Sequence, residues 1–511
     1  MGTGLQYPNP NMPTRILLAL LAAAVFAPAQ TRTNVTPGHR YPRLVIRGAM
    51  VVDGSGEPAA GPKDIVIENN MITDVVPLDS VALSRGDARR PQGDVNIDAT
   101  GKYVLPGLID VHAHTQDERG GIPQPLQYEL NIWLACGITT VRDVGSDTKK
   151  TIDLRQRSEA GSVAAPRMFV YPMIGSPRTP DAARQRVREI KAEGADGIKF
   201  LGIHREEMEA AADEAHKLGL RIAHHVGVED ANAWDDIKFG TTSIEHWYGI
   251  PDAALDDGVQ HFPADFNYNN EADRFRYGGR LWREANPEKL LKVLQAMVDN
   301  HVAWVPTLSI YEASRDVQRA RTQPWFKDYL HPTLEKYFEP NPANHGSYFD
   351  HWTSTDEAYW KENYRIWEAA LKEFGKRGGT IGVGDDAGFI YSMYGFGLIR
   401  ELELQQEAGF QPLKVIEHAT VDNARILGRE KDLGKVRAGY HADLIVVNGN
   451  PLDDFKVLYP TGVDSWVNGK EVHSGGIEWT VKDGIPYHGP TLMKEVKDMV
   501  AQARAKQGGA R

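Results

Sequence analysis

Two histidines close an apolar run in the first quarter of the chain. His112 and His114 follow residues 104–111, whose aliphatic side chains predict a buried strand. Residues two apart on a strand project from the same face, and neutral imidazole is a common nitrogen ligand of divalent transition metals. The pair therefore predicts half of a metal site at the carboxyl end of a strand. Taken alone, a His-x-His sequence fits two core or surface histidines equally well.

Further potential ligands stand where later strand-like segments end. They are Lys199, the adjacent pair His224 and His225, the pair Glu245 and His246, and the pair Asp385 and Asp386. Only one of two adjacent strand residues can face inward, so one histidine of the 224–225 pair is a candidate ligand. The joint position of all these groups at strand ends favours one shared metal site over a set of unrelated structural residues.

Lys199 lies in the apolar segment Gly-Ile-Lys-Phe-Leu, where burial of a charged ammonium would be costly. Carboxylation would convert its amine into an anionic oxygen ligand that can bridge two cations. A lysine that reaches across to an aspartate explains the same pattern equally well.

Asp386 lies in Gly-Val-Gly-Asp-Asp-Ala-Gly at the end of the last strand-like segment. A carboxylate there could bind a metal and also take the proton from metal-bound water, whose pKa a divalent ion lowers toward neutrality. The same group could later protonate the leaving group. We therefore assign Asp386 as the catalytic acid and base.

The elements that would carry these side chains alternate between strand-like and helix-like segments over residues 104–428. Strands are predicted at residues 104–111, 138–144, 167–174, 197–201, 220–225, 242–247, 302–308 and 380–384. Apolar residues at helical spacing predict a helix over 208–218 that Gly219 ends. Eight such units predict an α/β fold with a TIM-like (β/α)8 barrel, in which catalytic groups sit at the carboxyl ends of the strands.

Both ends of the chain show short β-rich runs between turn clusters. These lie in residues 41–100, 442–447 and 463–470, and we expect them to pair into one small β domain beside the barrel. Segments 251–287 and 310–365 are too long to be simple barrel connections and are rich in aromatic residues. They are expected to overhang the barrel mouth as a lid or binding wall, the alternative being solvated insertions.

Composition limits the possible partners and the compartment. The chain has 511 residues and a net charge of -11, without a Lys/Arg cluster that would indicate a nucleic-acid groove. Residues 1–29 resemble a secretory signal peptide, with an apolar run after Arg15 and a small-x-small site at residues 27–29. We expect export to the periplasm or outside the cell, and no membrane span after cleavage. An uncleaved anchor is the alternative. The single cysteine, Cys136, excludes an intramolecular disulfide.

Several motifs resemble those of the amidohydrolase superfamily. They are residues 104–114, Thr-Thr-Val-Arg-Asp-Val-Gly at 139–145, Gly-Ala-Asp-Gly-Ile-Lys at 194–199, Ser-Ile-Glu-His at 243–246, Val-Pro-Thr-Leu at 305–308, and residues 434–444. The sequence is most similar to the branch of metal-dependent amidases and dipeptidases related to imidazolonepropionase and Xaa-Pro dipeptidase. The resemblance implies a TIM barrel at 104–428 and a composite β-sandwich formed by 42–103 and 429–480.

The resemblance also implies a metal centre with two zinc ions, although other divalent metals are possible. The implied ligands are His112, His114, carboxylated Lys199, His225, His246 and Asp386. When the family motif is matched to the sequence without a gap from Gly219, the ligand of the fifth strand is His225. When it is matched through the glycine that follows the two histidines, the ligand is His224.

The sequence departs from the family pattern at two points. Asp385 replaces the usual Thr or Ser before the final aspartate, and His-His-Val-Gly replaces His-Ala-His-Gly in the fifth strand. The first change adds negative charge near the metals, and the second leaves fewer histidines to meet a substrate. Arg142 and Tyr248 lie close to the expected site, as substrate-binding residues or as salt-bridge and packing residues.

The leading hypothesis is a secreted hydrolase of amide or peptide C–N bonds, an amidase or dipeptidase, in which a metal-bridging hydroxide attacks the carbonyl. A mononuclear cyclic amidohydrolase or a deaminase is the alternative, since neither needs Lys199. A non-catalytic scaffold of the same fold is a third hypothesis. The expected partner is a small-molecule amide or peptide, and a homo-oligomer is possible.

Overall fold

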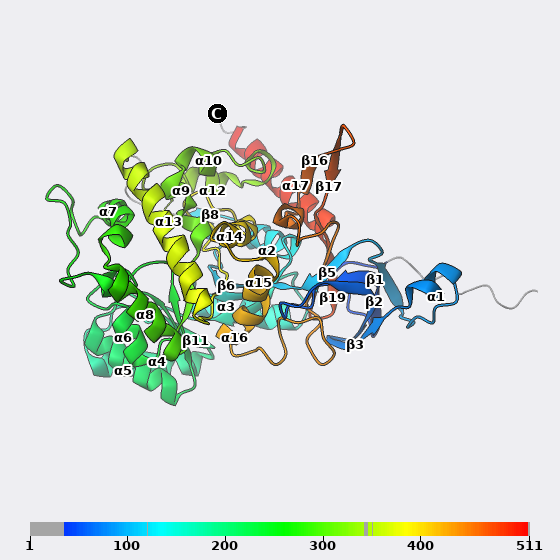
Figure 1. The fold of residues 1–511 in the computed structure, drawn as a ribbon, viewed down its shortest axis with the longest axis horizontal. Coiled ribbons are helices and arrows are strands. Elements are labelled where there is room, and N and C mark those ends of the chain that lie inside the picture. The colour runs from blue at the N-terminus through cyan, green and yellow to red at the C-terminus, as the bar shows by residue number, and fades with distance from the viewer. Residues whose placement is uncertain (1–34, 120, 342–345, 350, 509–511) are drawn as a thin grey trace, which may run out of the picture.

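A computed structural model describes residues 35–119, 121–341, 346–349 and 351–508. The predicted signal peptide lies outside these residues and stays a prediction. None of the described helices is long and apolar enough to cross a membrane. Elements of the central part of the chain form one body, and the terminal strands β1–β3 lie at its side (Figure 1).

The central part contains two parallel sheets rather than one continuous ladder. The first has the order β10-β9-β6, and the second has the order β11-β12-β13-β14. The strands are β6 (Leu108–Ala113), β9 (Ile138–Asp143), β10 (Arg167–Val170), β11 (Gly197–Leu201), β12 (Arg221–His225), β13 (Ser243–Glu245) and β14 (Ala303–Val305). Seven of the eight predicted barrel strands are therefore present.

Isolated β-bridges and a few backbone hydrogen bonds link the two sheets at both sides. Met173 bridges Lys199 beside β11, and Trp304 of β14 bridges Ile381. The Val111 amide of β6 donates to the Val383 carbonyl at 3.1 Å. The predicted eighth strand at 380–384 is thus reduced to an isolated bridge and a hydrogen bond. It nevertheless runs between β14 and β6, the position that an eighth barrel strand would occupy.

Helices connect the strands and carry the apolar faces that the sequence predicts. In α5 (Arg205–Lys217), Met208, Ala211 and Ala215 are buried, and Gly219 follows with a φ of 67°. The other connecting helices are α2 (Leu126–Ala135), α3 (Thr148–Glu159), α4 (Pro180–Glu193), α6 (Ala233–Phe239), α8 (Pro287–Asp299), α13 (Ser354–Lys376), α14 (Phe396–Glu407), α15 (Pro412–Glu417) and α16 (Asn423–Ile426). The predicted helix at 208–218 is confirmed, with a start three residues earlier.

The two aromatic-rich insertions are helical. They contain α7 (Glu271–Glu284), α9 (Leu308–Arg315), α10 (Val317–Arg321), α11 (Phe326–Tyr329), α12 (Pro332–Tyr337) and the beginning of α13. Phe275 of α7 stacks on Tyr311 of α9 with ring centroids 5.5 Å apart, and Trp360 of α13 stacks on both rings. This buried aromatic cluster packs the insertions against the barrel, so they are not solvated loops.

The apolar run at 104–111 is two strands, not the single strand predicted. β5 (Tyr103–Pro106) belongs to the terminal sheet, and β6 begins after Gly107. A Cβ atom at Gly107 would lie 2.2 Å from Thr139 Oγ1, so only glycine permits this crossing. The chain therefore enters the barrel at residue 107 rather than at 104.

Strands from both chain ends pair in one eight-stranded sheet, as expected. The order is β19-β18-β15-β5-β1-β2-β3, and β4 pairs with β1. The strands are β1 (Arg43–Val51), β2 (Ala60–Glu68), β3 (Met71–Pro77), β4 (Val95–Asp98), β5, β15 (Leu444–Val447), β18 (Ile477–Lys482) and β19 (Ile485–His488). Further short elements are α1 (Ser80–Arg85), β7 (Glu118–Arg119), β8 (Ile122–Pro123), η1 (Asp252–Ala254), η2 (His418–Asp422) and η3 (Phe455–Leu458).

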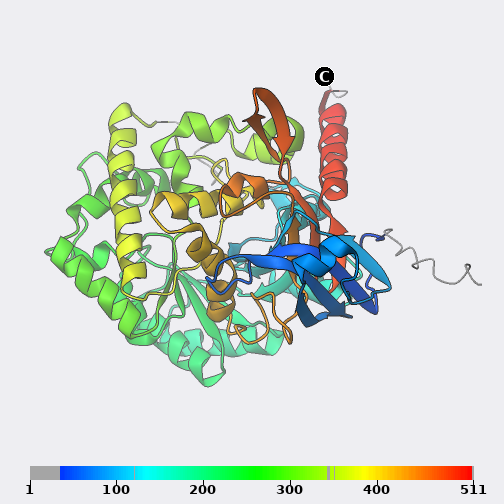
Figure 2. The same ribbon diagram turned by 45° about the vertical axis from the view of Figure 1, so that its right-hand side comes forward.

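One predicted member of this sheet is misplaced. Residues 463–470 form a separate hairpin of β16 (Val463–Val467) and β17 (Lys470–Ser474), because Asn468 and Gly469 make a tight turn that returns the chain on itself. The hairpin projects from the body beside the C-terminal helix α17 (Gly489–Gly508) (Figure 2).

A buried polar cluster ties the terminal sheet to the barrel. Asp483 after β18 pairs with Arg40 at 3.0 Å, with Arg167 of β10 at 3.3 Å and with His441 at 3.1 Å. Arg167 also pairs with Asp443 at 3.1 Å. These contacts join three segments that are far apart in the sequence.

We expect Asp483→Asn to destabilise the protein in a pH-dependent way. Burial alone would raise the pKa of Asp483, but the His441 hydrogen bond and the charges of Arg167 and Lys482 outweigh it and hold the pKa well below its usual value. A carboxyl with a depressed folded-state pKa contributes stability above its unfolded pKa of about 3.9 and loses it as the pH falls further. Denaturant unfolding should therefore show a large difference between wild type and variant at pH 7 and a smaller one near pH 3. Asp464→Asn, in the exposed ion pair with His473, is the control and should change little.

Candidate metal centre and active site

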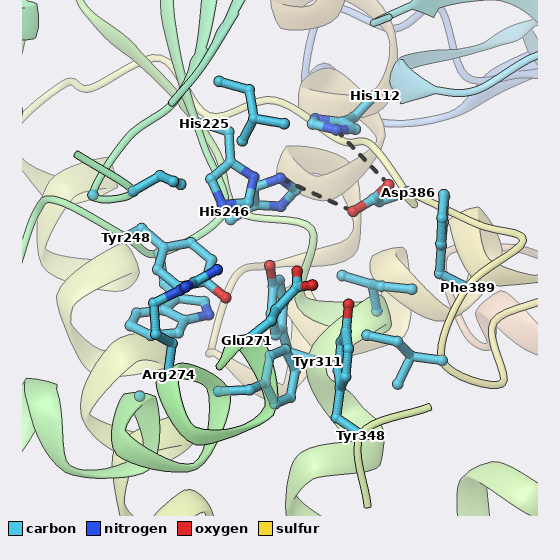
Figure 3. A pocket seen from close by; sticks show the side chains of 18 of the residues that line it. His112, His225, His246, Tyr248, Glu271, Arg274, Tyr311, Tyr348, Asp386 and Phe389 are labelled. Atoms are coloured by element: carbon cyan, nitrogen blue, oxygen red, sulfur yellow. Dashed lines mark ion pairs between the residues drawn. The ribbon is translucent and has the colours of Figure 1, made fainter. Parts of the chain in front are cut away.

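A cavity of about 610 Å³ opens at the carboxyl ends of the barrel strands, and all six predicted ligands line it. These are His112, His114, Lys199, His225, His246 and Asp386. Several of them converge from separate elements, with Tyr248 and Tyr311 opposite (Figure 3). The sequence argument from strand ends therefore located one site.

Three of these residues form a compact donor cluster around Asp386. One donor atom from each of His112, His246 and Asp386 lies within 4.8 Å of the others. The Asp386 carboxylate is 3.9 Å from Nε2 of both His112 and His246, and 3.1 Å from His114 Nε2. Burial lowers the pKa of His112 and of His246 well below the ordinary value, so both imidazoles are neutral and able to bind a cation.

The backbone at the cluster adopts conformations that non-glycine residues avoid. His246 has a φ of 64°, Thr307 one of 49° and Asp386 one of 47°. Hydrogen bonds fix two of these positions. The Asp386 amide donates to the His112 carbonyl at 2.9 Å, and His246 Nδ1 lies 2.7 Å from Thr307 Oγ1. Such strain concentrates at functional sites because the surrounding structure must hold it.

Glu245 orients the first histidine of the cluster. Its Oε2 lies 2.5 Å from His112 Nδ1, which leaves Nε2 directed at Asp386. Its Oε1 accepts hydrogen bonds from Ser243 at 2.5 Å and from Arg142 at 2.7 Å. A carboxylate behind a ligand histidine fixes the ring tautomer and raises its basicity. Sequence reasoning placed Glu245 at a strand end but gave it no role.

Arg142, a predicted substrate contact, is fully buried behind the cluster and does not line the cavity. Its guanidinium donates to Glu245, to Ser243 and to the Val111 carbonyl. The structure thus gives Arg142 the salt-bridge role that the sequence left as the alternative. Its interaction with substrate is excluded by burial.

We expect Glu245→Gln to weaken metal binding by about 10- to 100-fold, the usual cost of losing such a supporting carboxylate. The glutamine side chain is neutral, so it cannot balance the charge of Arg142. Its NH2 group is also a donor, whereas His112 and Arg142 both need an acceptor at this place. Titration of the metal-free variant with zinc and a competing chelator measures the effect. Glu229→Gln, on the loop after β12, is the control. Unchanged affinity in Glu245→Gln would mean that Glu245 only supports the fold.

Lys199 is buried among the ligands, with 2% of its surface exposed. Its Nζ has no hydrogen-bond partner in the part of the chain that the structure describes. Burial lowers the pKa of Lys199 to about 8, so about a tenth of the amine is uncharged at pH 7. Because Nζ has no partner among the described residues, Lys199 does not form the lysine–aspartate bridge that the sequence left as the alternative. Neutral imidazoles, a carboxylate and this amine together form a donor set that fits divalent metal ions.

The two adjacent histidines of β12 point in opposite directions. The His225 ring lies in the cavity, 4.6 Å from the His246 ring and stacked on Tyr248 at 4.7 Å. His224 is buried outside the cavity, with Nδ1 2.7 Å from Asp236 Oδ1. The structure therefore brings His225, and not His224, to the donor cluster.

Asp385 and Asp386 also diverge. Asp386 lines the cavity, whereas Asp385 is 1% exposed, accepts from the Ala387 amide at 3.1 Å and hydrogen-bonds with Asp110. Burial raises the pKa of Asp385 to about 6, and burial together with the charge of Asp385 raises the pKa of Asp110. The Asp385 carboxyl therefore faces Asp110 and not the cavity.

Tyr248 lines the cavity between His225 and the insertions. Burial raises the pKa of its hydroxyl, which is therefore neutral and able to donate near pH 7. A hydrogen bond joins it to Tyr311 of α9, and Glu271 and Arg274 of α7 line the cavity beside them. The aromatic composition of the insertions predicted a wall here, but it did not single out Tyr311, Glu271 or Arg274.

Comparisons with known proteins agree with this architecture. A model of the amidohydrolase family matches residues 103–262 and 335–472. The chain is 38% identical to the dihydroorotase of Trichlorobacter lovleyi over 110 residues, which are 22% of this chain and 23% of that enzyme. The chain thus spans about a quarter of the length of this curated relative.

Two solved structures show the same fold. A Xaa-Pro dipeptidase with bound methionine in the active site is 21% identical, with a TM-score of 0.60 over 87% of this chain and 100% of that one. A bottromycin amidohydrolase is 17% identical, with a TM-score of 0.63 over 91% and 92% of the two chains.

Proposed function

Because the chain belongs to the amidohydrolase family, we propose that it is a metal-dependent hydrolase of carbon–nitrogen bonds in small linear amides or peptides. The observation that carries the proposal is the convergence of all six predicted ligands on one cavity. The names of the similar proteins, a dihydroorotase and a Xaa-Pro dipeptidase, are consistent with C–N bond hydrolysis.

We propose two zinc ions as the cofactors. His112, His114, carboxylated Lys199, His225, His246 and Asp386 would hold them. The ions would supply a water of lowered pKa and polarise the substrate carbonyl. Support comes from the neutral state of the buried imidazoles and from the unpaired Lys199 amine.

The chain's own residues would then perform the remaining steps. Asp386, 3.1 Å from His114, accepts the proton of the attacking water on its carboxylate and delivers it to the leaving nitrogen. The neutral Tyr248 hydroxyl lies in the cavity beside His225, on which the Tyr248 ring stacks, and it can donate to the substrate's carbonyl oxygen. Residues of helices α7 and α9 line the cavity beside these groups.

The test is a substrate screen with zinc-loaded protein, using dipeptides, N-acyl amino acids and lactams. We expect hydrolysis of a linear amide, loss of activity with chelator and recovery with zinc, at two metal ions per chain. Lactam hydrolysis or ammonia release by protein with one ion would instead favour the mononuclear alternative. Metal binding without any turnover would favour the scaffold hypothesis.

A further inference from the structure

The outer wall of the cavity carries a charged pair that the proposed reaction does not use. Glu271 and Arg274 lie one turn apart at the beginning of α7, and both side chains extend toward the His246 side of the donor cluster (Figure 3). Residues 263–334, which include α7, lie between the two segments that the family model matches. The family model thus does not extend over the helix that carries the pair.

The two members of this pair differ in how their charge is compensated. Glu271 is hydrogen-bonded by the Tyr348 hydroxyl. Arg274 is partly buried and donates from Nη1 to the Tyr268 carbonyl at 2.8 Å. In the described part of the chain it has no ion pair within 4.0 Å, although the neighbouring Arg276 pairs with both Asp273 and Asp356. The Arg274 guanidinium also lies 5.8 Å from the centroid of the Tyr268 ring, and the residue lines the cavity. Arg274 thus has N–H donors left for a ligand.

The surroundings of Arg274 favour an anionic ligand group. The cavity wall near it is largely aromatic, with Phe262, Phe275 and Tyr277 among the lining residues. A guanidinium that loses water on an apolar wall gains most from a carboxylate, which it can bind through two parallel hydrogen bonds. The charge of Arg274 also acts on the Tyr248 hydroxyl. A carboxylate on Arg274 would therefore lie close to an amide whose carbonyl faces Tyr248.

We propose that Arg274 binds the free α-carboxylate of the substrate and makes the enzyme selective for N-acyl amino acids and peptides with an unblocked C-terminus. This inference rests on the proposed function. In such substrates the carboxylate is attached to the carbon next to the scissile nitrogen, and both Arg274 and Tyr248 line the cavity that would hold the substrate. The side chain on that carbon packs on the aromatic wall, so large apolar side chains are preferred.

The experiment compares N-acetyl-L-phenylalanine with N-acetyl-L-phenylalaninamide, which lacks the carboxylate charge. Zinc-loaded wild-type protein should favour the acid over the amide by roughly 10- to 100-fold in kcat/KM, as expected for hydrogen bonds between charged groups. Arg274→Met should remove this preference through a higher KM for the acid, with kcat changed only slightly. Arg274→Lys should restore part of it. Values for the amide should stay close to wild type, which shows that the variant is folded and loaded with metal.

Arg280→Met is the matched control, because Arg280 lies on the same helix but packs over the Phe266 and Tyr359 rings outside the cavity. It should keep the preference for the acid. Equal losses for acid and amide in Arg274→Met, or an unchanged preference, would overturn the proposal.

Binding of the same two compounds to zinc-loaded Asp386→Asn protein separates this inference from the proposed function. Calorimetry should show tighter binding of the acid, and adding Arg274→Met should remove the difference. If wild-type protein hydrolyses neither compound but the binding difference holds, the proposed function fails for these amides while the carboxylate site stands. Equal binding of acid and amide overturns the carboxylate site itself.

Discussion

Lys199→Ala should abolish turnover and remove at least one metal equivalent per chain. The amine lies among the ligands with no hydrogen-bond partner among the described residues, so its removal costs the fold no native polar contact. It would, however, delete the group that we place between both ions. Loss of a supporting residue already costs about 10- to 100-fold in metal affinity or activity, and loss of a bridging ligand should exceed that. Elemental analysis and kcat measured on the same samples give both quantities.

A chemical rescue makes this test specific. A short carboxylic acid in the buffer can occupy the space left by the side chain and should restore part of the activity and metal content. The control is Lys482→Ala, which removes another buried lysine, one whose Nζ donates to the Ser158 carbonyl at 2.8 Å. That variant should lose stability but keep its metal stoichiometry. One ion in active wild-type protein together with normal turnover in Lys199→Ala would instead establish the mononuclear alternative.

Asp386→Asn should lower kcat by roughly 10²- to 10⁴-fold, the usual contribution of general acid–base catalysis. The asparagine keeps the size of the side chain but cannot take a proton from the attacking water. The backbone N–H of residue 386 donates to the His112 carbonyl, and this hydrogen bond should persist because it does not involve the side chain. Steady-state kinetics, with circular dichroism as a check of the fold, measures the effect.

Asp385→Asn is the matched variant, because it makes the same change one residue away. Asp385 faces Asp110 rather than the cavity, and an amide can replace one carboxyl of such a pair. We expect less than about a tenfold change in kcat. An inactive Asp385→Asn beside an active Asp386→Asn would show that the proton carrier is misassigned. Metal content should be measured for both variants, since Asp386 is also a proposed ligand.

The sequence predicted those features that depend on local patterns. Alternating strands and helices predicted seven barrel strands close to their observed positions, and the six proposed ligands at strand ends all line one cavity. This worked because the carboxyl ends of parallel strands meet at one edge, so a position along a strand already implies a position in space. The family suggested by the motifs is confirmed by the family model.

Features that depend on tertiary packing could not be predicted from the sequence. Arg142 lies in a strand that is buried on both sides, so alternation could not tell a substrate contact from a salt bridge to Glu245. The break at Gly107 depends on Thr139 of a neighbouring strand. Arg274 reaches the cavity only because α7 packs over the barrel mouth, and aromatic composition alone does not fix that placement.

The direct passage from β5 into β6 has a consequence for the order in which the protein matures. β5 is hydrogen-bonded to β1 on one side and to β15, residues 444–447, on the other. A nascent chain that does not yet include β15 leaves one edge of β5 unpaired. β6, which contains His112 and is followed by His114, continues directly from β5. We therefore expect β5 and β6 to be fixed in place only after most of the C-terminal part has been synthesised. On the proposed function, metal binding would then follow completion of the chain.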